Sequence, residues 1–360
     1  MSDGDRSLRI HRFRVARSGL VHGRSNDALE TLGDGEYGKA KNVSSNILAA
    51  TATRSPDDRF LSMCFFSFEF DYNDVNKVDP PVPLQLDMDL VVGDESERSN
   101  KGIAMSRLPD LPAKVGLMPT CPISAAGELW APYLTSFHGP SKFVMQRLDK
   151  DAGRWVEVAA VDVPLPPQST SFREDSIPVI QGFAVVGHTI LLSLYPYHLF
   201  FTFDCFTSWA PVVTNNNEKH NYMPIRKRGV YVEEDDIIYC LCGGCVVYAY
   251  KLICIDKTGQ YRMAAPTIVD RVYPTHNEGS GFLAHLGGRV MCFVWIGLRL
   301  RCSCDDTKHV LVTTFRIKGD DDRGRFIPKG VEVLHSTCRR LLGILPRKTC
   351  GCYYEFSFLQ

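Results

Sequence analysis

The residue types with the clearest chemical potential in this sequence are cysteines. Cys240, Cys242 and Cys245 lie within the stretch CLCGGC. Thiolates bind zinc tetrahedrally, usually from two C-x2-C pairs at a defined separation. Only Cys242 and Cys245 have this spacing, and no second C-x2-C or H-x3-H pair follows them. On a strand, Cys240 and Cys242 would point to the same face, so we predict buried structural cysteines, with a metal or redox role as the alternative.

Motifs for nucleophilic catalysis and phosphate binding do not occur. Residues 279–282, GSGF, lack the spacing of Gly-x-Ser-x-Gly, and neither GxxxxGK[ST] nor GxGxxG is present. His276, Glu278, Ser280 and His285 cluster in the sequence, but they flank the start of a predicted repeat unit. Loop polar residues and an inner-strand histidine explain this cluster, so we predict no catalytic residue.

Charged residues occur in short runs of both signs. The acidic runs are residues 233–236 and 320–322, and the basic stretches are residues 225–229 and 298–302. Neither acidic run supplies calcium ligands at the fixed alternate positions of an EF-hand loop, so we predict hairpin turns with solvated carboxylates. Lys+Arg and Asp+Glu are both 41, and this balance gives no general attraction for polyanions. We predict an ordinary surface for the basic stretches, no metal, no cofactor and no nucleic-acid partner.

Composition indicates a folded chain in a reducing compartment. The chain has 360 residues and 44% hydrophobic content, enough for a sizeable core. Its 13 cysteines are an odd number, and the N-terminus has no apolar core of a secretory signal. The longest apolar region is interrupted by Gly187, His188, Pro196 and His198. We therefore predict a cytoplasmic or nuclear protein that has no membrane partner.

The sequence around these residues predicts strands that recur in a repeating unit. AVVGHTILLSL, residues 184–194, is a glycine-centred hairpin, and similar units recur along the chain. The predicted turns lie at Gly127, Gly187, Asp235 and Gly287, separated by 60, 48 and 52 residues. This spacing is typical of a kelch-type β-propeller. We predict an all-β propeller of about six four-stranded antiparallel blades, with an incomplete ring as the alternative.

Aromatic residues recur near the predicted fourth strand of each unit. Trp155 and Trp209 follow a charged turn in the first two units, Tyr261 takes this place in the third, and only Phe326 is available in the fourth. A large flat side chain here would fill the widening gap between neighbouring wedge-shaped sheets.

The two ends of the chain are less regular. We predict an N-terminal segment over residues 1–50 that is partly disordered, and a propeller domain over residues 51–360. A strand near residues 8–15 could pair with the C-terminal CGCYYEFSFLQ to close the ring. Helical spacing occurs only near residues 29–32 and 337–345.

Several stretches carry a family resemblance: RWVEVAAVDVPLPPQS, IQGFAVVGHTILLSL, a TFD strand followed by SW, and RGVYVEEDDIIYCL. Over residues 106–318 the chain resembles the kelch-like propeller families of unknown function that are greatly expanded in grasses. The resemblance implies a propeller fold and a plant source. Relatives of these families often carry an N-terminal F-box that recruits a ubiquitin ligase scaffold. The first 45 residues here are polar and Gly-rich and lack such a helical segment.

A propeller gathers its loops at two faces around a central channel, which suits the recognition of a protein or peptide. We therefore predict a non-enzymatic protein-interaction module, a monomer that binds protein partners through aromatic loop residues. The predicted binding residues are Tyr195, Tyr197, His198, Tyr273 and His276.

Two other functions stay open. The chain could be a substrate-recognition subunit that acts with a ubiquitin ligase. It could also be a propeller enzyme with a site in the central channel, which would need convergent Asp, Glu or His residues near the axis. The predicted innermost strands, such as FAVVG and GVYVE, are mostly apolar and disfavour that site. A diverging copy that is losing its blades is a further alternative.

Overall fold

The structure is a computed structural model built from β-strands. It describes residues 11–12, 14–15, 18–22, 30–31, 46–54, 60–68, 82–89, 103–112, 122–135, 141–163, 179–195, 199–206, 208–214, 222–242, 245–255, 260–272, 279–298, 308–322 and 324–340. In these residues every regular element is a strand, and none forms a helix that could cross a membrane.

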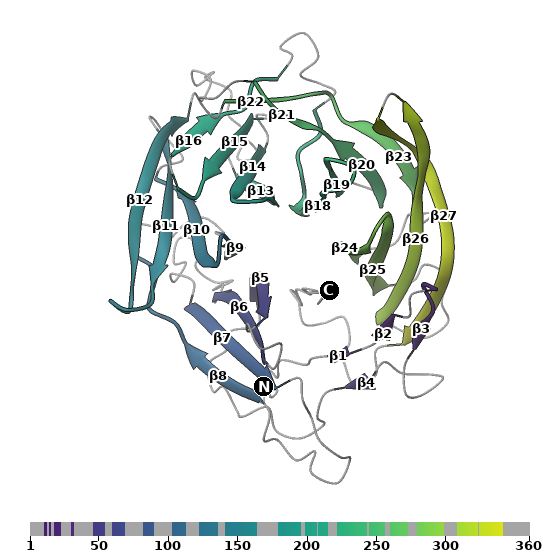
Figure 1. Ribbon diagram of the computed structural model, residues 1–360. Helices are drawn as coiled ribbons and strands as arrows, with labels where there is room; N and C mark the ends of the chain where they lie inside the picture. Colours follow the sequence, from purple (N-terminus) through teal and green to yellow (C-terminus); the bar gives the residue numbers. More distant parts are fainter. Residues whose placement is uncertain are drawn as a thin grey trace, which may run out of the picture.

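Antiparallel sheets stand side by side around a central opening (Figure 1). The first contains β5 (Asn46–Arg54), β6 (Phe60–Phe68), β7 (Val82–Asp89) and β8 (Ile103–Arg107). The second contains β9 (Ile123–Ala125), β10 (Glu128–Leu134), β11 (Ser141–Asp149) and β12 (Arg154–Val163). The third contains β13 (Val179–Val186), β14 (Thr189–Tyr195), β15 (Leu199–Asp204) and β16 (Trp209–Pro211), with β17 (Lys227–Arg228) beside β13.

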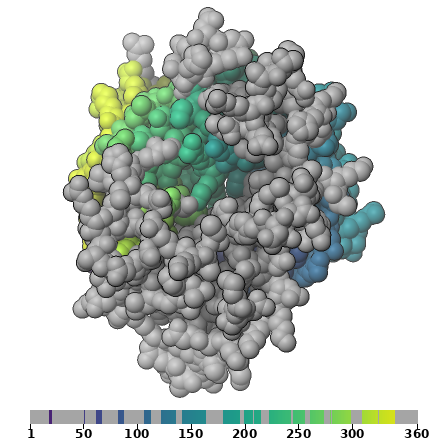
Figure 2. All heavy atoms as spheres, turned by 180° about the vertical axis from the view of Figure 1, so that it is seen from behind, coloured from purple at the N-terminus to yellow at the C-terminus, as the bar shows by residue number. Residues whose placement is uncertain are grey.

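The chain continues around the ring in the same sense. The fourth sheet contains β18 (Val230–Val232), β19 (Ile237–Cys242), β20 (Val246–Tyr250) and β23 (Thr267–Arg271). A separate hairpin, β21 (Leu252–Cys254) and β22 (Tyr261–Met263), lies between β20 and β23 in sequence. The fifth sheet contains β24 (Gly279–Gly287), β25 (Val290–Leu298), β26 (Lys308–Asp322) and β27 (Arg325–Arg340). From behind, the yellow, green and teal parts follow one another around the molecule (Figure 2).

This arrangement confirms the predicted all-β, propeller-like fold. In each of the five larger described sheets the first strand lies nearest the central opening, and the later strands follow outward (Figure 1). Gly127, Gly187 and Asp235 lie in the turns between the first and second strands of their sheets, and Gly287 ends β24 at the equivalent turn. The repeat of hairpin turns was therefore readable from the sequence.

The chain termini differ from the prediction. Residues 30–31 form β4 (Glu30–Thr31), which pairs with β1 (His11–Arg12), and residues 337–340 belong to β27, so helix is wrong at both places. In β27, pairing with β26 along the whole strand overrides the local helical spacing. The predicted C-terminal closing strand lies outside the described residues. The predicted boundary at residue 50 falls inside β5.

The N-terminal strands lie in the sector between the first and fifth sheets. Besides β1 and β4, this sector contains β2 (Arg14–Val15) paired with β3 (Val21–His22) (Figure 1). The Thr314 hydroxyl on β26 donates a hydrogen bond of 2.5 Å to the Gly19 carbonyl. The N-terminal segment is thus attached to the last described sheet.

The core lies between neighbouring sheets, where aromatic rings interlock. Trp130 and Phe143 of the second sheet contact Phe203 and Phe201 of the third, with ring centroids 5.1 and 4.9 Å apart. The Trp209 ring stacks on Phe143 at 5.5 Å. These side chains are buried and remove a large apolar area from water, which is the main stabilising term for such a fold.

The recurring aromatic residues also bind the preceding sheet by hydrogen bonds. The Trp155 indole N–H donates to the Pro109 carbonyl at 2.9 Å, and the Trp209 indole N–H donates to the Ala159 carbonyl at 3.2 Å. In the β21–β22 hairpin the Tyr261 hydroxyl lies 3.3 Å from the Thr189 hydroxyl of the third sheet. The predicted filling of the gap between sheets is observed for both tryptophans, which are buried.

We expect Trp155→Phe and Trp209→Phe each to lower the free energy of unfolding by about 1–2 kcal/mol. Each substitution keeps an aromatic ring but leaves a carbonyl of the neighbouring sheet without its donor. Urea unfolding followed by fluorescence would measure the change. Phe206→Leu is the matched control, because Phe206 is 74% exposed and should tolerate the substitution. Unfolding midpoints that match the control would contradict a stabilising role for these hydrogen bonds.

Candidate functional site

The predicted binding residues lie almost entirely outside the described part of the chain. Tyr195 is the last residue of β14, and the structure describes its backbone but not its side chain. Tyr197, His198, Tyr273 and His276 also lie outside the described residues. The predicted aromatic binding surface therefore stays a prediction.

The cysteine cluster is placed on β19 and at its end. Cys240 and Cys242 are buried, as predicted, whereas Cys245 is half-buried after the turn to β20. The Cys242 sulfur lies 3.6 Å from the Pro224 carbonyl oxygen and 3.7 Å from the Tyr250 hydroxyl. No group of three metal-ligating side chains occurs in the described residues.

Burial determines the ionisation of most described thiols. It raises the pKa of Cys64 and of Cys245 to about 11, and that of Cys292 to about 12. The pKa of Cys242 is lowered instead, chiefly by a hydrogen bond from Cys240. Because Cys242 is only 4% exposed, this thiol has little access to a dissolved reactant.

The acidic turn between β18 and β19 differs from the predicted solvated turn. Asp235 is buried, and its carboxylate accepts hydrogen bonds from the Arg289 guanidinium at 2.8 Å and the Tyr239 hydroxyl at 3.2 Å. The Arg289 guanidinium also lies 3.5 Å from the centre of the Phe326 ring. A carboxylate is stable here because a cation from the fifth sheet pairs with it. Asp235 thus joins the fourth and fifth sheets.

The next residue, Asp236, points to solvent and carries a different set of contacts. Its φ of 52° is in the left-handed region, which Asp tolerates better than most residues. One carboxylate oxygen accepts a hydrogen bond of 3.2 Å from the Tyr231 hydroxyl. The other lies 3.1 Å from the Lys251 ammonium. Two donors therefore fix the orientation of an accessible carboxylate.

Asp236 lies at the edge of a groove of about 490 Å³, which we call the acid groove. The groove combines an apolar wall with an acid, two cations and a phenol. Its lining residues are Val186, Asp236, Lys251, Leu252, Ile253, Cys254, Tyr261 and Arg325. These residues come from the third, fourth and fifth sheets and the β21–β22 hairpin, so the groove exists only where sheets meet.

The acid groove has the components of acid–base chemistry on a polar substrate. Asp236 could accept a proton, while Lys251 and Arg325 could stabilise developing negative charge. Burial and the nearby Asp236 charge raise the pKa of Tyr231 to about 12, so its phenol stays protonated and donates to the carboxylate near neutral pH. Local motifs could not reveal this site. The left-handed turn position of Asp236 and the nearby Tyr231 are local signals, but Val186 and Arg325 come from distant parts of the sequence.

Two basic residues on β17 lie beside β13. The basic stretch 225–229 was predicted as ordinary surface, but Ile225 is buried and β17 pairs in parallel with β13. The Lys227 ammonium lies 3.6 Å from the centre of the Phe282 ring. A methyl group added at Gly182 would contact the backbone carbonyl of Ile225 at 2.5 Å, so glycine is needed for this close approach.

Comparisons with known proteins give remote structural similarity only. No protein-family model and no curated protein matches the sequence. A proposed 6-phosphogluconolactonase from Bacteroides fragilis has a TM-score of 0.41 at 12% identity, over 89% of this chain and 92% of that chain. The Fusarium graminearum α-L-arabinofuranosidase Arb93A has a TM-score of 0.38 at 10% identity, over 94% and 99%. An α-L-arabinanase from Penicillium chrysogenum has a TM-score of 0.33 at 8% identity, over 80% and 94%.

These findings correct two predictions. The structures named above are a proposed lactonase and two glycosidases, which contradicts the prediction of a non-enzymatic interaction module and of no enzymatic activity. The prediction rested on the apolar innermost strands, whereas the described acid groove lies between sheets. TM-scores this low assign neither an activity nor a substrate to this chain.

We expect alkylation by iodoacetamide at about pH 8 to separate the described thiols by exposure. Cys254 and Cys338 are exposed and should react in the folded protein. Cys64 and Cys292 should react only after unfolding, because burial excludes the reagent and raises their pKa to about 11 and 12. Peptide mass spectrometry would measure the order. Alkylation of Cys292 as fast as of Cys254 would show that the inter-sheet packing is wrong.

Proposed function

We propose that this chain is a hydrolase that acts on the carbonyl group of a small ester or lactone in the acid groove. One observation carries this proposal. An accessible carboxylate, Asp236, is held by Tyr231 and Lys251 at the edge of a groove that also contains Arg325 and Tyr261. A groove of about 490 Å³ is within the usual range for small-molecule sites.

In the proposed reaction, Asp236 acts as general base. Each oxygen of a carboxylate has two lone pairs, so Asp236 keeps acceptor capacity for a water after binding Tyr231 and Lys251. Asp236 would take a proton from this water as its oxygen bonds to the substrate carbonyl carbon. Lys251 and Arg325 would stabilise the negative oxygen of the tetrahedral intermediate. The bond to the ester oxygen then breaks, and the proton on Asp236 passes to the leaving alkoxide.

The composition of the acid groove favours an ester over a glycosidic bond. Glycosidases generally use two carboxyl groups about 5–9.5 Å apart, one as acid and one as nucleophile or base. Among the described lining residues of the acid groove, Asp236 is the one carboxylate. Ester hydrolysis requires a single base and stabilisation of an oxyanion, and these residues can supply both.

We propose a kelch-like propeller of about six blades, in which the N-terminal strands take part in the sector between the first and fifth sheets. Supporting this, β2 and β3 lie beside the last sheet, and Thr314 binds Gly19 (Figure 1). Membership of the grass-expanded kelch-like families, a monomeric state and a cytoplasmic or nuclear location remain predictions.

The decisive test is hydrolysis by the wild-type protein and by Asp236→Asn. A panel of glucono-δ-lactone, γ-butyrolactone, p-nitrophenyl acetate and p-nitrophenyl α-L-arabinofuranoside would cover both bond types. We expect hydrolysis of at least one ester or lactone, with kcat about 10²–10³-fold lower in Asp236→Asn because the general base is lost. Asparagine suits this position because it tolerates the left-handed backbone.

Asp151→Asn is the control, because Asp151 lies in an exposed turn between β11 and β12, away from the acid groove. It should keep full activity. The proposal is wrong if the wild-type protein hydrolyses no ester or lactone in the panel, or if Asp236→Asn and Asp151→Asn have the same kcat. Equal thermal unfolding of the variants would exclude misfolding as the cause of a lost activity.

A further inference from the structure

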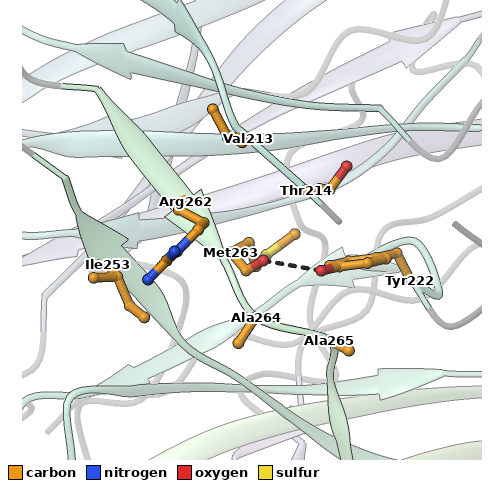
Figure 3. Close-up of a pocket in the computed structure, with 8 residues that line it drawn as sticks. All are labelled: Val213, Thr214, Tyr222, Ile253, Arg262, Met263, Ala264 and Ala265. Carbon is orange, nitrogen blue, oxygen red and sulfur yellow. Dashed lines mark hydrogen bonds between the residues drawn. The ribbon is translucent and has the colours of Figure 1, made fainter. Parts of the chain in front are cut away.

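A second groove, of about 460 Å³, lies beside the same β21–β22 hairpin, and we call it the arginine groove (Figure 3). Its lining residues are Val213, Thr214, Tyr222, Ile253, Arg262, Met263, Ala264 and Ala265. The pairing of Ile253 with Arg262 places both on one face of the hairpin, and Cys254 and Tyr261 on the other. Ile253 lines both grooves, so the arginine groove and the acid groove adjoin at this hairpin.

Hydrogen bonds between separate segments hold the frame of the arginine groove. The Val213 N–H donates to the Tyr261 carbonyl at 2.9 Å, and the Met263 N–H donates to the Val213 carbonyl at 3.0 Å. The Tyr222 hydroxyl donates to the Met263 carbonyl at 3.1 Å (Figure 3). Because these bonds hold three segments together, binding of a ligand does not cost the conformational entropy of assembling the groove.

The lining chemistry defines the kind of ligand. The walls are mostly apolar, and Val213 is 40% exposed at the rim. Arg262 is the one charged residue among the described lining residues, and its side chain is exposed. No ion pair of Arg262 occurs within the described part of the chain. A guanidinium presents paired N–H donors that match a carboxylate.

We propose that the arginine groove binds a small monoanion with an apolar body, namely a medium-chain or aromatic carboxylate. Arg262, whose side chain points toward Ile253 (Figure 3), binds the carboxylate. The apolar body lies against Val213, Ile253 and Ala264, where it is removed from water. The volume of the groove suits a ligand of this size rather than a folded partner. This proposal does not depend on hydrolysis in the acid groove.

Isothermal titration calorimetry with decanoate would test the proposal on the full chain. We expect saturable binding of decanoate at one site per chain, and at least about tenfold weaker binding of decanol, which lacks the charge. Arg262→Gln should weaken decanoate binding by about tenfold or more and leave decanol binding unchanged. Ala264→Leu, which fills the groove, should weaken both ligands.

Arg154→Gln is the matched control, because Arg154 is an exposed arginine at the start of β12 in a different sheet. It should bind decanoate like the wild type. The proposal is overturned if decanoate does not bind, if decanol binds equally well, or if Arg262→Gln and Arg154→Gln have the same affinity. Circular dichroism and thermal unfolding of each variant would confirm that a loss of binding does not come from a loss of fold.

Discussion

Burial of aromatic side chains between adjacent sheets is the interaction on which the rest of this structure depends. A single antiparallel sheet of this size has two faces, and neither can stay apolar in water unless another sheet covers it. Here Trp130, Phe143, Phe201 and Phe203 fill one such junction with edge-to-face contacts. Because the described sheets stand around an opening (Figure 1), a junction between neighbours widens toward the outside. The two outer tryptophans fill that end at the junctions that contain them.

Both grooves arise where the β21–β22 hairpin lies against neighbouring sheets. The β21–β22 hairpin leaves the fourth sheet and pairs with Val213, which follows the outer strand of the third sheet. It therefore adds a wall over the junction, and its Ile253 lines both grooves. Asp235 and Asp236, although adjacent, have different roles. The Asp235 carboxylate is buried in its ion pair with Arg289, which joins two sheets. The Asp236 carboxylate stays accessible to a substrate.

Local pattern predicted much of the fold and little of the site. Alternating apolar residues and turn residues identified the hairpins at Gly127, Gly187 and Asp235, because strand register depends on nearest neighbours in sequence. Burial of Asp235 was not predictable, because its partner Arg289 lies 54 residues later in a different sheet. The same reason explains why the acid groove was missed. Lys251 reaches Asp236 within the β19–β20 hairpin, but Val186 and Arg325 come to the groove from the third and fifth sheets, and no spacing rule encodes that meeting.

The bonds between sheets also have a direction along the chain. In each recurrent contact the aromatic residue comes later in the sequence than its hydrogen-bonding partner. Trp155 binds Pro109, Trp209 binds Ala159, and Tyr261 contacts Thr189. During synthesis from the N-terminus, each partner has therefore left the ribosome before the residue that binds it. Every new sheet can dock on a sheet that is already present, so its apolar face is exposed to solvent only briefly. Because each tryptophan belongs to the later of the two sheets that it joins, these contacts favour assembly of the sheets in the order of the sequence.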